Sequence, residues 1–76
     1  MNMPELPPRQ AEAVQVIRRL TFEQRFPPTL REIAQAMHVS HSTARQYIVS
    51  LEAKGRITRS VATSRSIVLV DPVAST

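Results

Sequence analysis

The chain has 76 residues, enough for one domain, and a domain of this size buries only ~60% of the surface of its unfolded chain. It contains no Cys, which excludes disulfide bonds and Cys-based zinc sites as supports for so small a core. Ten Lys and Arg residues against six Asp and Glu residues give a net charge of +4, which favours a polyanionic partner such as nucleic acid. No apolar run approaches the ~18 residues of a membrane span and no signal-peptide pattern opens the chain, so we expect a cytoplasmic protein without a membrane partner.

The first 28 residues predict a flexible N-terminal segment, a helix and a tight turn after it. Residues 1–8 hold three Pro and no periodicity, which predicts a flexible segment. Apolar residues recur at helical spacing over residues 9–24, and Pro8 suits the first turn of such a helix. The recurring residues are Ala13, Val14, Ile17, Leu20 and Thr21, with Val16 flanking them. Residues 25–28 interrupt the helix, and their two Pro residues are expected to direct Phe26 into the core.

A capping box marks the start of a second helix. Thr29 and Glu32 have the required spacing, at which each side chain accepts a hydrogen bond from the backbone amide of the other residue. The expected buried face of this helix consists of Leu30, Ile33, Ala34 and Met37. Val39 follows in a tight turn, where we expect its apolar side chain to fill the space between two helices.

A third helix is expected from Ser40, a favourable N-cap, to about Lys54. Its inner stripe consists of Ala44, Ile48 and Leu51, with Tyr47 beside it. Gly55, the only Gly of the chain, follows Lys54 where a left-handed helix end requires it. Two short helices joined by a tight turn, the second with a polar outer face, are typical of a helix-turn-helix that places its second helix in the DNA major groove.

The remaining residues predict a β-hairpin, because the hydrophobic period changes from 3.6 to 2. Residues 56–60 and 66–70 are the predicted strands, and residues 61–65 form a small basic tip. The hairpin has to bury its apolar side chains against the helices, namely Ile57, Ile67 and Leu69. The predicted fold class is mainly α with a small β-hairpin, a three-helix winged helix-turn-helix over residues 9–71 with residues 72–76 as a flexible tail.

The outer face of the third helix carries the candidate base-contacting residues. They lie opposite or beside the apolar stripe and are Ser42, Thr43, Arg45, Gln46 and Val49. Arg45 suits guanine O6 and N7, Gln46 suits adenine N6 and N7, and Val49 suits a thymine methyl group. A merely solvated helix face is the alternative for Arg45 and Gln46.

Candidate contacts to the DNA backbone lie at helix ends and on the hairpin. They are Thr29, Ser40, His41, Lys54, Arg56, Arg59, Ser64 and Arg65. The helix N-termini at Thr29 and Ser40 favour a phosphate through their backbone amides and the helix dipole, and capping alone is the alternative for both residues. Arg59, Ser64 and Arg65 on the hairpin would bind phosphate or enter the minor groove, and a solvated loop is the alternative for them. Lys54 also complements the negative end of the third helix.

The sequence predicts neither a metal site nor an enzyme. His38 and His41 are three residues apart, but no Cys and no suitably spaced carboxylate accompanies them. A single Gly excludes a Gly-rich phosphate loop, and the Ser residues lie at caps and turns without an arranged base and acid. We therefore expect no catalytic residues and no cofactor.

Several short motifs in fixed order resemble one family. They are Arg9-Gln10, Ile17-Arg18, Phe26-Pro27-Pro28-Thr29, Glu32-Ile33-Ala34-Gln35, Lys54-Gly55-Arg56-Ile57 and Ala62-Thr63-Ser64-Arg65-Ser66-Ile67. Their order and spacing over residues 9–70 resemble the N-terminal DNA-binding domain of LexA, the repressor of bacterial DNA-damage genes. The resemblance implies a winged helix-turn-helix that binds double-stranded DNA and is associated with the nucleoid.

The chain also departs from that family. The turn over residues 37–44 is one residue shorter in this chain, and the third helix has different outward side chains, so the LexA operator sequence is not carried over. LexA-like repressors have a second domain that dimerises and cleaves itself with a Ser/Lys pair. The only Lys here, Lys54, lies at a helix end and no such domain follows Thr76, so we expect no self-cleavage.

The expected function is a sequence-specific transcriptional regulator of bacterial or phage origin, most simply a repressor. Double-stranded DNA is the expected partner, and a homodimer on DNA or a protein partner are further options. Two alternatives stay open: a winged-helix protein-interaction module, such as an anti-repressor or assembly factor, and a DNA-binding fragment of a longer LexA-like repressor. A continuous basic face that joins Arg45, Lys54, Arg59 and Arg65 would favour DNA, whereas an apolar patch around the third helix would favour a protein partner.

Overall fold

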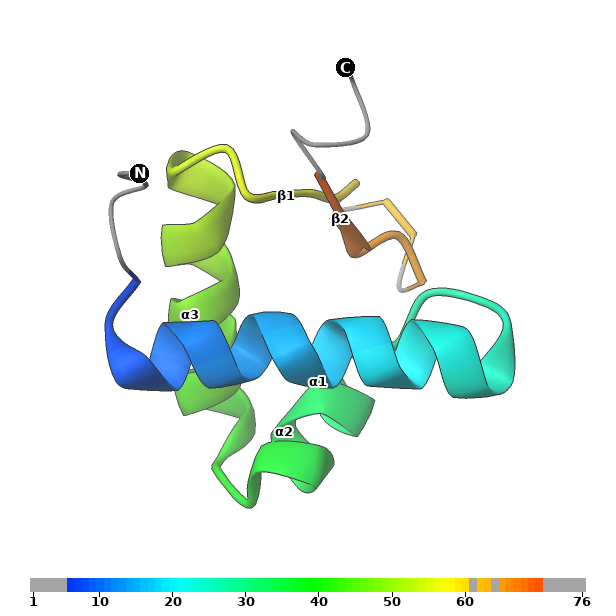
Figure 1. Cartoon of the computed structure of the whole chain (residues 1–76), viewed down its shortest axis with the longest axis horizontal. Helices are drawn as coiled ribbons and strands as arrows, with labels where there is room; N and C mark the ends of the chain where they lie inside the picture. The colour runs from blue at the N-terminus through cyan, green and yellow to red at the C-terminus, as the bar shows by residue number, and fades with distance from the viewer. Residues whose placement is uncertain (1–5, 61, 64, 71–76) are drawn as a thin grey trace.

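A computed structural model describes residues 6–60, 62–63 and 65–70, and it contains three helices followed by a β-hairpin (Figure 1). The helices are α1 (Pro8–Gln24), α2 (Leu30–Met37) and α3 (His41–Ala53). The strands β1 (Ile57–Thr58) and β2 (Val68–Leu69) pair antiparallel, with Ile57 opposite Leu69 and Thr58 opposite Val68. This order confirms the predicted three-helix winged helix-turn-helix.

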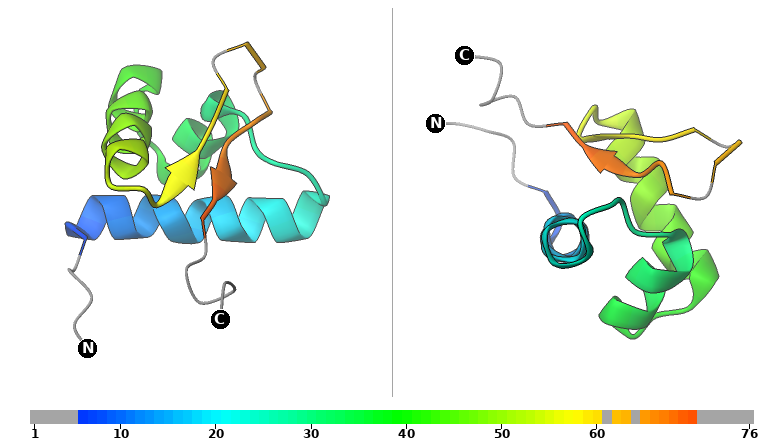
Figure 2. Two further views of the ribbon diagram at one scale, coloured as in Figure 1. Left: turned by 90° about the horizontal axis from the view of Figure 1, so that it is seen from above. Right: turned by 90° about the vertical axis from the view of Figure 1, so that its right-hand side faces the viewer.

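The helices and the hairpin share one apolar core. Figure 2 shows α1 along one side of the molecule, with α2, α3 and the hairpin together on its other side. Buried side chains from all of these segments meet between them: Ala13, Val14, Val16, Ile17, Ile33, Met37, Ile48, Leu51, Ile57 and Ile67. Leu6, Leu20, Leu30, Val39, Tyr47 and Leu69 pack against this core and are partly buried. The hairpin is therefore part of the folded body, as its apolar residues predicted.

Two details of α1 differ from the prediction. The helix begins at Pro8, which occupies the first turn, one residue before the expected start. Val16 is buried, although the periodicity placed it only beside the stripe, and Thr21 is exposed, although the periodicity placed it within the stripe. The buried residues of α1 lie in the middle of the helix, between Ala13 and Ile17, so Thr21 in the last part of the stripe extends beyond the core.

The prediction for Phe26 was wrong. Its side chain is 45% exposed, and Pro28 is the fully buried residue of this corner. Arg25 ends α1 in the left-handed conformation, with φ 70° and its amide bonded to the Thr21 carbonyl. The helix therefore ends where it was predicted to end, but the Phe26 ring stays at the surface under the guanidinium of Arg65.

The strands are shorter than predicted. Two residues pair on each side, whereas the alternating pattern suggested five. Below the paired residues, the Val70 amide donates to the Arg56 carbonyl at 2.9 Å. Toward the tip, contacts of one hydroxyl group take the place of backbone hydrogen bonds between the strands. The Ser66 hydroxyl accepts from the Ser60 amide at 2.8 Å and contacts the carbonyl oxygens of Ser60 and Thr63, both at 2.9 Å.

Candidate nucleic-acid interface

The helix-turn-helix is built by local capping. The Thr29 hydroxyl accepts from the Glu32 amide at 3.1 Å, and the Glu32 carboxylate accepts from the Thr29 amide at 2.9 Å. This geometry confirms the predicted capping box. His38 ends α2 in the left-handed conformation, with φ 59°, and the Ser40 hydroxyl accepts from the Thr43 amide at 3.1 Å to start α3. The turn therefore sets the direction of α3 with hydrogen bonds between near neighbours.

The candidate base-contacting residues share the outer side of α3. Ala44, Ile48 and Leu51 are fully buried on the inner side, which leaves the opposite side of the helix at the surface. Four of the five candidates are exposed, namely Ser42, Arg45, Gln46 and Val49. The fifth, Thr43, is half-buried and its hydroxyl lies 2.9 Å from that of Ser40, so its side chain takes part in the cap.

A basic cleft separates the start of α2, the start of α3 and the hairpin. It encloses about 470 Å³ and is lined by Thr29, Leu30, Arg31, His41, Arg45, Arg59, Ser60, Thr63, Ser66 and Ile67. Figure 2 shows these three segments grouped on one side of α1. The lining combines three Arg, hydroxyl groups and the first turns of two helices, and such groups bind phosphate oxygens.

The basic cleft brings together four predicted residues: Thr29, His41, Arg45 and Arg59. Sequence reasoning missed four of its polar residues, namely Arg31, Ser60, Thr63 and Ser66. The capping box contained a signal for Arg31, because the second residue after an N-cap lies in the first helical turn, where the backbone amides attract anions. Nothing local indicated the three hairpin hydroxyls, since their position depends on how the hairpin folds against α2.

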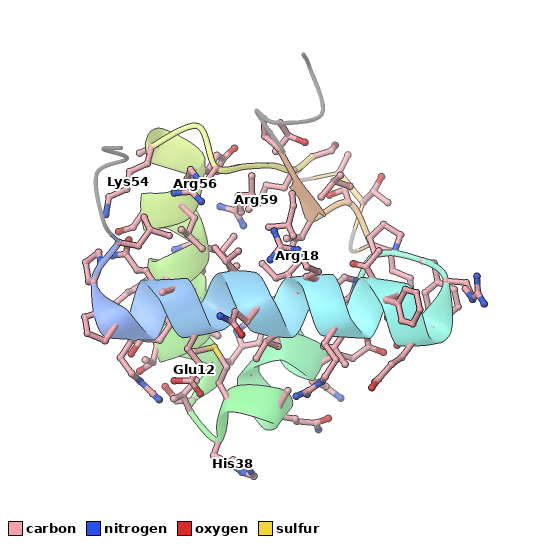
Figure 3. All side chains as sticks on the ribbon, in the orientation of Figure 1. Glu12, Arg18, His38, Lys54, Arg56 and Arg59 are labelled. Atoms are coloured by element: carbon pink, nitrogen blue, oxygen red, sulfur yellow. The ribbon has the colours of Figure 1, made fainter. Side chains whose placement is uncertain are left out.

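The other predicted backbone contacts lie away from this cleft or are held by internal bonds. Lys54 donates to the Gln10 side chain at 2.7 Å, and it lies with Arg56 at the far end of α3 (Figure 3). Arg59 lines the cleft, but its Nε donates to the Glu52 carboxylate at 3.1 Å and its side chain is 16% exposed. Ser64 lies outside the described residues.

Arg65 is held most extensively. Its guanidinium donates to both oxygens of the Glu32 carboxylate at 3.0 and 2.9 Å and to the Pro27 carbonyl at 3.0 Å. The same group lies 4.6 Å from the centre of the Phe26 ring. The hydrogen bonds from Arg65, then from the Thr29 amide and from Gln24, lower the pKa of Glu32 to about 2. The carboxylate is therefore charged at neutral pH, which keeps the ion pair intact.

Within the described residues the structure shows no cluster of three or more metal-ligating side chains. His38 points away from the body of the molecule at the α2–α3 turn (Figure 3).

None of the helices described is long and apolar enough to cross a membrane.

Comparison with known proteins assigns the family. Residues 3–66 match the model of the LexA DNA binding domain, which covers most of the chain. The chain belongs to this family. It is 39% identical over 69 residues to LexA repressor 1 of Geobacter sulfurreducens, an overlap of 90% of this chain and 34% of that relative. It is also 39% identical over 75 residues to the LexA repressor of Geotalea uraniireducens, which covers 97% of this chain and 37% of that relative.

The LexA-family domain spans about a third of the length of these curated relatives. The LexA repressor of Pseudomonas aeruginosa gives the same proportion, with 39% identity over 66 residues and 32% of that relative covered. The predicted resemblance is therefore confirmed, and the shared part is the DNA-binding part of the family.

Proposed function

We propose that this LexA-family domain binds double-stranded DNA at specific sequences and represses transcription by occluding promoters. The observation that carries the proposal is the free outer side of α3 beside the basic cleft, because base readout and phosphate contacts then share one continuous surface. Arg45 and Gln46 would read base edges, while Arg31 and the first turns of α2 and α3 would contact phosphates. The domain acts by binding alone, without catalysis or cofactor, in the cytoplasm.

The distribution of apolar surface favours DNA over a protein partner at this face. Among the described residues, the exposed large apolar side chains are Phe22, Phe26, Val49, Val68 and Val70. Val49 is the one that belongs to α3, and a single exposed Val suits a thymine methyl group better than a protein interface.

Assembly on DNA follows from the size of the domain. A single DNA-binding module buries ~600–1,000 Å², which gives modest affinity. We therefore propose that tight binding requires two copies on a two-fold symmetric site, or a partner protein.

Selection from a randomised duplex library at ~150 mM salt tests the proposal. We expect an enriched motif for the unmodified chain and its loss for the R45A/Q46A double variant. The R19A/Q15A double variant is the matched control, because it removes the same two side-chain types from exposed positions on α1. Weak binding without a motif would refute sequence-specific recognition, and equal loss in both double variants would refute readout by α3. Symmetry in the motif would support a dimer on DNA, and a motif without a repeat would contradict it.

A further inference from the structure

The hairpin of this LexA-family domain is tied to α2 by one pair of side chains that the proposed function does not use. Arg65 lies 33 residues after Glu32, and its guanidinium makes a bidentate contact with that carboxylate at 2.9 and 3.0 Å. It also donates to the Pro27 carbonyl at 3.0 Å and lies over the Phe26 ring at 4.6 Å. Four contacts thus hold one arginine: two come from Glu32 in the first turn of α2, and two come from Pro27 and Phe26 between α1 and α2.

The Glu32 carboxylate is the centre of this arrangement. It accepts hydrogen bonds from the Thr29 amide at 2.9 Å and from the Gln24 side chain at 3.2 Å, in addition to those from Arg65. One carboxylate therefore connects the end of α1, the cap of α2 and the hairpin. Bidentate Arg–carboxylate contacts fix orientation as well as distance, because the planar guanidinium fits two oxygens in one geometry only.

The pair adjoins the basic cleft. Thr29, Leu30 and Arg31, which directly precede Glu32, line the α2 side of the cleft, and Ser66, which directly follows Arg65, lines its hairpin side. The described strands pair over two residues each, so the backbone ladder ends well before this point. The Glu32–Arg65 contact therefore joins the α2 side of the cleft to its hairpin side.

We propose that Glu32 and Arg65 are positioning residues, which set the hairpin at the distance from α2 and α3 that DNA requires, and that Arg65 itself does not bind phosphate. This inference rests on the proposed DNA binding. It departs from the sequence prediction for Arg65, which was a direct contact with phosphate or with the minor groove. Opening this pair to release the guanidinium would give up two charge-assisted hydrogen bonds, the Pro27 bond and the contact with the Phe26 ring together.

The sign of the effect of removing Glu32 distinguishes the two roles. Neutralising a carboxylate on a DNA-binding surface strengthens binding if charge alone matters, because DNA is a polyanion. The positioning role predicts the opposite. We expect E32Q to weaken binding to the selected motif roughly three- to tenfold, since an exposed ion pair and a cation–π contact are both modest interactions. Gln is accepted at this position of a capping box, so α2 keeps its start.

The control for charge is E23Q, which neutralises an exposed carboxylate on α1. We expect it to bind the motif as tightly as the unmodified chain or slightly more tightly. All variants are compared at a temperature well below their melting midpoints, so that a loss of folded protein does not enter the measured affinity. If E32Q binds as tightly as E23Q, the positioning role is overturned.

The salt dependence of binding tests Arg65 separately. R65K keeps the positive charge but loses the bidentate geometry, and R65Q loses both. A direct phosphate contact would make R65Q lower the slope of log K against log salt by about 1 and leave R65K nearly unaffected. The positioning role predicts that both variants weaken binding three- to tenfold with an unchanged slope, and that E32Q/R65Q is no weaker than either single variant. If the unmodified chain selects no motif, the proposed function fails, and the positioning role that rests on it fails with it.

Discussion

The burial of the hairpin makes a quantitative prediction about Ile67. Ile67 is 3% exposed and Ile57, which lies in the same core, is 2% exposed, while the two described strands pair over only two residues each. A hairpin this short is not stable by itself, so its buried side chains must hold it against the helices. Truncating a buried Ile to Ala costs ~2–5 kcal/mol. A domain of this length is stable by ~4–11 kcal/mol, so I67A should remove a large part of the total and lower the melting temperature by roughly 10–30 °C.

Urea and thermal unfolding followed by far-ultraviolet circular dichroism measure this effect, because the signal comes from the helices. The matched control is V68A, at the next residue along the chain and the first residue of β2, which is 47% exposed and should change stability by less than ~0.5 kcal/mol. I67V, with an expected cost of ~0.5–1.5 kcal/mol, gives a measurable variant if I67A does not fold. Equal small effects of I67A and V68A would refute the conclusion that the hairpin and helices form one cooperative core.

Three further predictions concern local features. S40A should lower the free energy of unfolding by ~1 kcal/mol, and S40G should lower it by only a few tenths of a kcal/mol, because Gly is tolerated at an N-cap. Equal losses for the two variants in urea unfolding would contradict a capping role. G55A should cost ~1–2 kcal/mol in the same assay, because Gly55 has φ 75° and no neighbour would contact the new methyl group; a stabilising effect would refute strain as the cause. The pKa of Glu32 is lowered from 4.5 to about 2, so its contribution to stability is complete above pH 4.5 and is lost as the pH falls from 4.5 toward 2. Urea unfolding over that window should show a shallower loss for E32Q, and parallel curves would contradict the assignment.

Local signals predicted most of this fold. The interactions of the capping box, of the Ser40 N-cap and of the Gly after α3 join residues at most four apart. A stretch of four or five residues therefore contains the whole interaction. The apolar stripes of α2 and α3 were also complete in the sequence, because each helix presents one face to one core. These are the features for which structure and prediction agree.

The errors concern contacts between distant segments. Phe26 was expected in the core because two Pro residues follow it, but its ring stays at the surface beneath Arg65, which lies 39 positions later in the chain. Periodicity reports which side of a helix is apolar and says nothing about which side chain from another segment covers a given ring. The Glu32–Arg65 pair and the hairpin side of the basic cleft were not predicted for the same reason, because both depend on contacts between segments far apart in the sequence.

The sequence gives the number of basic residues, but only the fold determines which of their side chains are free to bind DNA. Arg9, Arg59 and Arg65 form ion pairs with carboxylates, and Lys54 donates to Gln10, so the net charge of +4 is not spread evenly over the surface. In the part of the chain that the structure describes, no hydrogen bond or ion pair engages the side chains of Arg31 and Arg45, and both line the cleft.

The availability of Arg31 leads to a prediction that composition alone would not give. R31Q should lower the salt slope of DNA binding by about 1 and weaken binding to all sequences alike, because a phosphate contact carries no base information. R19Q removes the same charge from α1, away from the cleft, and should leave the slope unchanged. Titration of fluorescent duplexes, specific and scrambled, between ~50 and 200 mM salt measures both slopes. Equal slopes for R31Q and R19Q would mean that the domain attracts DNA by its total charge, and the basic cleft would then have no special part in binding.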